Sequence, residues 1–143
     1  MSSPSNLLLL IGGTLSITAA LAHVAIIIGG PDWYRFFGAG EGMAKMAERG
    51  ELYPTLITLA IATVLFTWGL YAFSGAGLIM KLPLVKYALM AITAVYVLRG
   101  LAFIPIYLFR PDIMSSFWVW SSLICLTFGI THALGTWRAW ANL

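Results

Sequence analysis

The chain has 143 residues, of which 61% are hydrophobic and only 9% are charged, and its formal net charge is +3. A soluble domain carries roughly 25% charged residues, so this composition is typical of a membrane protein. The positive charges are scattered and form no basic run, which argues against a nucleic-acid partner. Because Cys125 is the single cysteine, the chain cannot form an internal disulfide or a cysteine metal cluster.

Four apolar stretches occupy most of the chain, at about residues 7–28, 53–73, 84–109 and 114–137. A helix that crosses a bilayer needs roughly 20 apolar residues, and each stretch reaches that length. No basic residue precedes the first stretch, so we interpret it as a retained span and not as a signal peptide. The sequence therefore predicts an all-α integral membrane protein. We expect residues 1–143 to form a single transmembrane domain, an up-down-up-down four-helix bundle.

The connection between the first two spans carries most of the charges. Residues 32–50 predict one or two short amphipathic helices lying on the membrane surface, with Asp32 as N-cap and Gly50 as the C-terminal stop. We expect Trp33 and Tyr34 to anchor this interfacial segment at the level of the lipid headgroups.

Four spans place both termini and the second connection on one membrane face. That face carries only the basic residues Lys81, Lys86 and Arg138, whereas all five acidic residues fall on the other face. The count of Lys and Arg near the span ends does not decide the orientation. A purely basic face suits anionic inner-leaflet lipid, so we expect cytoplasmic termini and a location in the cell (inner) membrane.

Three ionisable residues, His23, Arg99 and His132, lie inside the predicted spans. At 100° per residue, both histidines fall on stripes of small or polar residues, so we expect them to face other helices and not lipid. A lone arginine in the middle of a span costs on the order of 3 kcal/mol, so Arg99 needs a partner. Pro105 removes the backbone hydrogen bond to Leu101, which predicts a kink or an end of the third span near Arg99.

These residues predict a ligand pocket at the face of the first connection. Arg99 and His23 would form its polar floor, and the first connection would be its lid. Arg99 would hold an anionic group through its fork of donors, and His23 would make binding depend on pH. The remaining predicted ligand-binding residues are Tyr34, Arg35, Glu41 and Tyr96. The alternative is that Arg99 snorkels or pairs structurally with Asp32, Glu41 or Glu51.

The second histidine, His132, lies at a similar depth to Tyr71, so we predict a structural hydrogen bond between them. His23 and His132 lie roughly 9 Å and 27 Å from the same face, too far apart in depth to share a haem iron. The sequence has no His/Glu/Cys cluster at metal-ligand spacing, so no metal or cofactor is expected.

Three functions remain open. The first is a binding module for an amphiphilic or anionic, lipid-like ligand, with membrane lipid as the partner. The second is an accessory or scaffold subunit of a larger membrane complex, or a homo-oligomer. The third is an enzyme on a lipid-soluble substrate, with His23 and Glu41 or Glu51 as acid and base. Protein partners would dock on stripes of small residues, namely Gly12, Ser16 and Ala20, or Gly129 and Ala133.

Overall fold

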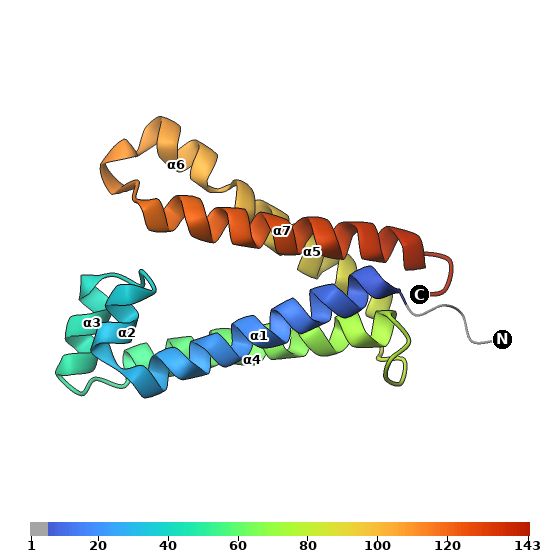
Figure 1. Ribbon diagram of the computed structural model, residues 1–143, viewed down its shortest axis with the longest axis horizontal. Helices are drawn as coiled ribbons and strands as arrows, with labels where there is room; N and C mark the ends of the chain where they lie inside the picture. Colours follow the sequence, from blue (N-terminus) through green and yellow to red (C-terminus); the bar gives the residue numbers. More distant parts are fainter. Residues whose placement is uncertain (1–5) are drawn as a thin grey trace. The chain divides into compact units, whose positions relative to one another are not determined.

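The structure, a computed structural model, describes residues 6–143, and every regular element within them is a helix (Figure 1). Four helical segments are long and apolar enough to cross a membrane. These are α1 (Leu7–Gly29), α4 (Tyr53–Gly75), α5 with α6 (Val85–Leu101 and Phe103–Phe109), and α7 (Ser116–Ala139). The predicted all-α fold with four spans is confirmed, and each span starts and ends within two residues of its predicted limits.

Three short helices complete the fold: α2 (Pro31–Phe36), α3 (Glu41–Glu48) and the 3-10 turn η1 (Pro111–Ile113). The chain divides into two compact units, and the division falls inside α1 and α4. The first unit contains the start of α1, up to Leu15, together with Trp68–Leu143, and the second contains Ser16–Thr67. Each unit is described by itself.

In the first unit, four helices pack in a closed antiparallel arrangement through small residues. In each packed pair, residue numbers rise along one helix as they fall along the other. Without a side chain, glycine lets helix backbones approach closely, which is the usual way in which membrane helices associate. The close approaches are Gly13 with Phe73 (α1–α4), Gly75 with Leu89 (α4–α5), Gly100 with Leu126 (α5–α7) and Gly135 with Leu9 (α7–α1).

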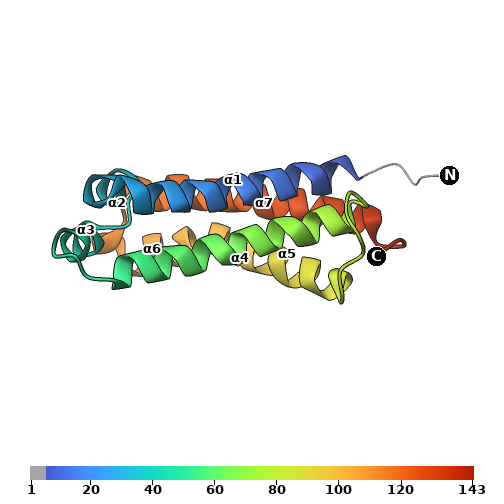
Figure 2. The same cartoon turned by 90° about the horizontal axis from the view of Figure 1, so that it is seen from below.

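The second unit holds α2 and α3, which lie side by side in both views (Figure 1 and Figure 2). Tyr34 of α2 is only 2% exposed and packs with Ile26 and Ala44. Its hydroxyl accepts a hydrogen bond from Thr58 of α4 at 3.3 Å. The prediction of Tyr34 as a headgroup anchor is therefore wrong: its ring fills the core of this unit, and its polar tip is satisfied inside the chain.

The start of α2 also differs from the prediction. Asp32 lies in the first turn of the helix, and Gly30 occupies the N-cap position without a side-chain cap. Pro31 is the first helical residue, a position that suits proline because the N–H it lacks would have no partner there.

The outside of the four spans is largely apolar, which is stable against lipid and unstable against water. Exposed side chains of this kind include Leu56, Ile61, Val64, Val95, Leu98 and Ile124. Length, composition and apolar exterior together define the architecture of an integral membrane protein.

Candidate functional site

The contact between α5 and α7 begins with two glycines. A Cβ atom at Gly100 would lie 2.7 Å from the backbone nitrogen of Leu126, and one at Gly129 would lie 2.8 Å from the side chain of Val97. Backbones that approach this closely bring the residues beside them into direct contact. Arg99 precedes Gly100, so its side chain starts next to the N-terminal part of α7.

Arg99 is held by three residues of α7. Its Nη1 donates to Ser122 Oγ at 3.1 Å, and its Nη2 donates to Ser121 Oγ at 2.9 Å. The guanidinium carbon lies 4.8 Å from the centre of the Trp118 ring, a cation–π distance. All three partners are neutral, and a guanidinium has five N–H donors. This cluster of Arg99, Trp118, Ser121 and Ser122 is the candidate site, and we call it the Arg99 cluster.

The carboxylates of the chain are bound by other arginines. Each of the five acidic side chains accepts a hydrogen bond from an arginine other than Arg99. Arg35 binds Asp32, Glu41 and Glu48, Arg49 binds Glu51, and Arg110 binds Asp112. The predicted alternative, in which Asp32, Glu41 or Glu51 neutralises Arg99, therefore has no support from these hydrogen bonds.

A break in the third span lies just beyond the Arg99 cluster. Helix α5 ends at Leu101 and α6 begins at Phe103, as predicted from Pro105, which has no N–H for the carbonyl of Leu101. Arg99 consequently lies in the last turn of α5. A positive charge is favourable there, because the last carbonyls of a helix carry partial negative charge.

His23 belongs to the second unit, whereas the Arg99 cluster is built from the first unit alone. His23 is partly buried, and its Nδ1 lies 2.7 Å from the carbonyl oxygen of Ala19, one turn earlier in α1. Since a carbonyl only accepts, Nδ1 carries the hydrogen, and Nε2 of the neutral ring is an acceptor.

The predicted residues Arg35 and Glu41 form a cluster that ties α2 to α3. Arg35 donates from Nε and Nη2 to both oxygens of Glu41, at 2.8 and 2.9 Å, and from Nη2 to Glu48 at 2.6 Å. The hydrogen bonds to Glu41 and Glu48 raise the pKa of Arg35, and the bond to Arg35 lowers the pKa of Glu41 below its usual 4.5. These contacts satisfy Arg35 within its own connection.

Tyr96 and His132 lie in an aromatic cluster of the first unit. The ring of Tyr96 lies 5.0 Å from Trp68, 5.4 Å from Phe128 and 5.1 Å from His132, measured between ring centres. His132 is fully buried, as its predicted inward position requires, and a Cβ at Gly12 would lie 2.9 Å from its ring.

The hydrogen bond predicted between His132 and Tyr71 is not formed. Nδ1 of His132 lies 2.8 Å from the carbonyl oxygen of Phe128, and Nε2 has no partner within residues 6–143. The histidine therefore bonds to its own helix, in the same manner as His23.

Most of the small residues predicted as docking surfaces pack inside the chain, and Ala133 is partly buried. Gly12 lies against His132 and Gly129 lies against Val97, while Ser16 and Ala20 are buried. Neither glycine is free to receive a helix from another protein.

Sequence reasoning missed the residues that hold Arg99. These residues are Trp118, Ser121 and Ser122, none of which was predicted as part of a site. A comparison of how deep each residue lies in its predicted span could have identified the serines as partners of Arg99. Arg99 lies about ten residues before the end of its predicted span, and Ser121 lies about seven residues after the start of the next.

Within residues 6–143, no group of three or more His, Cys, Asp or Glu side chains could hold a metal ion. Comparison with known protein families, with curated proteins and with solved structures finds no match to this chain. The Arg99 cluster must therefore be interpreted from its own chemistry.

Proposed function

We propose that this chain is a small integral membrane protein that binds an anionic, lipid-like amphiphile through Arg99. The observation that carries the proposal is a guanidinium in a membrane-length helix whose hydrogen bonds go to two neutral hydroxyls. Hydroxyls orient this cation without neutralising it. An anionic headgroup would supply the missing charge.

The chemistry of guanidinium defines the ligand class. Its planar fork matches a carboxylate or phosphate with two parallel hydrogen bonds, and such bonds are roughly twice as strong as neutral ones. Ser121 and Ser122 engage one N–H on each terminal nitrogen, so donors remain for a headgroup. The apolar exterior of α5 and α7 would accept a hydrocarbon tail.

The other two functions find less support. A scaffold subunit was expected to dock through Gly12 or Gly129, and both glycines pack inside the chain. An enzyme was expected to use Glu41 or Glu51 as a partner of His23, and these two carboxylates are bound by Arg35 and Arg49. Binding uses Arg99, a cation within a membrane-length segment for which the described bonds provide no counter-charge.

The proposed membrane placement follows from the distribution of charge. We propose that α2 and α3 lie at the membrane surface, because their exposed ion pairs require water. The termini would face the cytoplasm in a cell (inner) membrane, since the connection between α4 and α5 and the end of α7 carry only basic residues.

Thermal unfolding in neutral detergent tests the binding function. Oleate should raise the unfolding temperature of the wild-type chain, whereas oleyl alcohol, which has the same tail without the charge, should not. Arg99→Leu should abolish the effect of oleate, and Arg99→Lys should retain part of it, because lysine keeps the charge and loses the fork.

The matched control is Lys45→Gln, which removes one positive charge from an exposed position on α3. This variant should respond to oleate as the wild type does. An unchanged oleate effect in Arg99→Leu, with the variant folded by circular dichroism, would contradict the proposal.

A further inference from the structure

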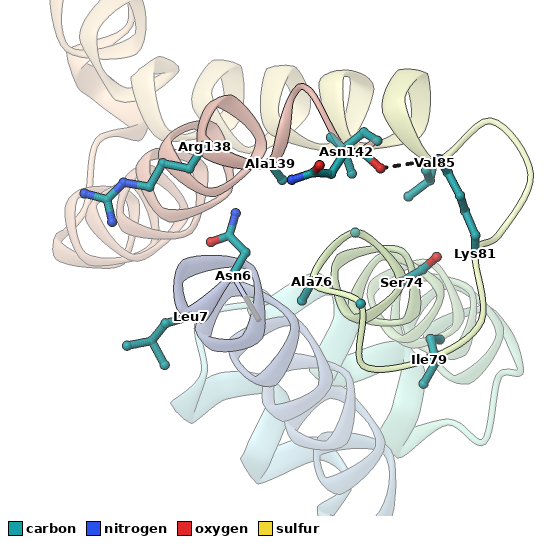
Figure 3. A pocket seen from close by; sticks show the side chains of 13 residues that line it. Asn6, Leu7, Ser74, Ala76, Ile79, Lys81, Val85, Arg138, Ala139 and Asn142 are labelled. Atoms are coloured by element: carbon teal, nitrogen blue, oxygen red, sulfur yellow. Dashed lines mark hydrogen bonds between the residues drawn. The ribbon is translucent and has the colours of Figure 1, made fainter. Parts of the chain in front are cut away.

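A second candidate site lies at the other end of α5, where the first unit has a cavity of about 500 Å³ (Figure 3). The end of α4, the start of α5, the end of α7 and the start of α1 surround it. Val85 lines this cavity, whereas Arg99 lies 14 residues further along α5, roughly 21 Å away along a helix. The cavity is therefore separate from the Arg99 cluster.

The charged side chains that line the cavity are both positive. Lys81 and Arg138 contribute them, and no acidic side chain is present among its described lining residues. Lys81 donates a hydrogen bond of 3.4 Å to the backbone carbonyl of Asn142, drawn in Figure 3. Both cationic side chains are exposed. They are long and flexible, so both can turn toward an anion in the cavity.

Arg138 is the only one of the five arginines whose side chain has no hydrogen bond or ion pair to residues 6–143. Its donors are therefore available to a ligand. Ser74 and Asn6, which also line the cavity, are used structurally. The Ser74 hydroxyl donates to Met80 and accepts from Leu82, and the Asn6 side chain donates to the carbonyl of Gly135.

Tryptophans give the depth of the cavity in the membrane. Trp137 and Trp140 lie on either side of Arg138 at the end of α7 and are both exposed, and Lys86 lies over the Trp140 ring at 3.9 Å. Tryptophan is enriched at the level of the lipid headgroups. Lipid phosphates occupy the same level, so a cationic cavity here meets them at high local concentration.

We propose that this cavity binds a phosphate group through Lys81 and Arg138. The phosphate could belong to an anionic lipid headgroup or to a small soluble phosphate, and both present the same charged oxygens to the two side chains. The inference is independent of Arg99, because no residue is shared between the two sites.

Native mass spectrometry of the full chain in neutral detergent tests this inference. Phosphatidylglycerol should bind to the wild type more tightly than zwitterionic phosphatidylcholine does. The double variant Lys81→Gln/Arg138→Gln should bind phosphatidylglycerol about tenfold more weakly, the loss expected when charge-assisted hydrogen bonds are removed. Arg99→Leu should bind it as the wild type does, so failure here and failure of the proposed function are separable.

Lys86→Gln is the matched control, because it removes one charge from the same end of α5 without removing a lining residue. It should weaken binding less than the single variant Arg138→Gln does. Arg138→Lys should retain most of the affinity for phosphatidylglycerol. This result would show that the loss of affinity in Arg138→Gln comes from the missing charge and not from misfolding.

Competition with glycerol phosphate identifies the source of the phosphate. No competition supports a lipid headgroup, and full competition supports a soluble phosphate in the same site. The inference is overturned if the double variant binds phosphatidylglycerol like the wild type. It is also overturned if Lys86→Gln loses as much affinity as Arg138→Gln. The affinity for phosphatidylglycerol would then depend on the total positive charge at this end of the chain and not on the residues that line the cavity.

Discussion

Arg35 and Arg99 carry the same side chain in two different surroundings. Arg35 lies in the connection between α1 and α4 and binds three carboxylates, whereas Arg99 lies in a membrane-length helix and binds two serine hydroxyls beside a tryptophan ring. In water, an ion pair costs little to form and contributes little to stability. In a span, a second charge would itself have to leave water, so neutral hydroxyls are a cheaper way to orient the cation. The described bonds therefore neutralise Arg35 within its own connection, whereas those of Arg99 provide no counter-charge.

The largest change in stability is expected when α5 and α7 are forced apart. This separation would disrupt the Arg99 cluster and leave the Arg35 cluster intact. In Gly100→Ala, the new methyl group would meet the backbone of Leu126 at 2.7 Å. The two helices must then move apart, at a cost of about 2 kcal/mol in the free energy of unfolding. Unfolding in denaturant, followed by circular dichroism, measures this loss.

Gly42 of α3 provides the control for that substitution. A Cβ there meets nothing within 4 Å, so Gly42→Ala should be neutral or stabilising by up to roughly 1 kcal/mol, since alanine favours helix. Equal destabilisation by both alanine substitutions would show that the close approach at Gly100 does not matter.

Replacing each arginine by leucine tests the comparison directly. Arg99→Leu should change stability by less than about 1 kcal/mol, because it also removes a charge from the span, and the serines can bond to their own helix. Arg35→Leu should destabilise the chain, because it leaves Asp32, Glu41 and Glu48 close together without their shared cation. Thermal unfolding of both variants without ligand gives the answer. A larger loss in Arg99→Leu would reverse the roles assigned to the two residues.

Acid should weaken the Arg35 cluster and spare the hydrogen bonds of the Arg99 cluster. The pKa of Glu41 is held below its usual 4.5 by the hydrogen bond from Arg35. A group whose pKa is lowered by folding stabilises the folded chain above its unfolded pKa, and that contribution is lost as the pH falls through the lower, folded value. The unfolding temperature of the wild type should therefore drop as the pH falls from 5 to 3.

Glu41→Gln cannot titrate at this position, so it should show a smaller drop over the same pH range. The wild type and Glu41→Gln should differ in unfolding temperature at pH 7, and the difference should shrink as the pH falls below 4.5. Parallel curves would mean that the pair of Arg35 with Glu41 makes no contribution to stability.

The smallest change in stability is expected from a substitution of Trp118, whose ring lies against the Arg99 guanidinium. Trp118→Phe keeps an aromatic face of weaker negative potential, so it should cost about 0.5 kcal/mol of stability through the cation–π contact. Measured again in the Arg99→Leu background, the same substitution should cost less, and the difference is the energy of the contact. Equal costs in both backgrounds would show that the ring stabilises α7 without contacting the cation.

Part of this site was predictable because it depends on local chemistry. Arg99 stands out as a charge in an apolar stretch, and Pro105 predicts the break that separates α5 from α6. The inward position of His132 follows from helical periodicity, and its side chain is indeed fully buried. Tyr34 was misplaced because an aromatic residue beside a span suits both a headgroup anchor and a small core.

The sequence by itself determined the four spans and their limits, because the length of an apolar run and the thickness of a bilayer are matched without reference to any other part of the chain. Only the tertiary structure decided which residues Arg99 and His132 contact. Periodicity gives the side of a helix on which Arg99 or His132 lies, but the residue that it meets depends on the axial offset between two helices. In this chain the contact of Gly100 with Leu126 fixes that offset for α5 and α7, and it brings Arg99 to Ser121 and Ser122.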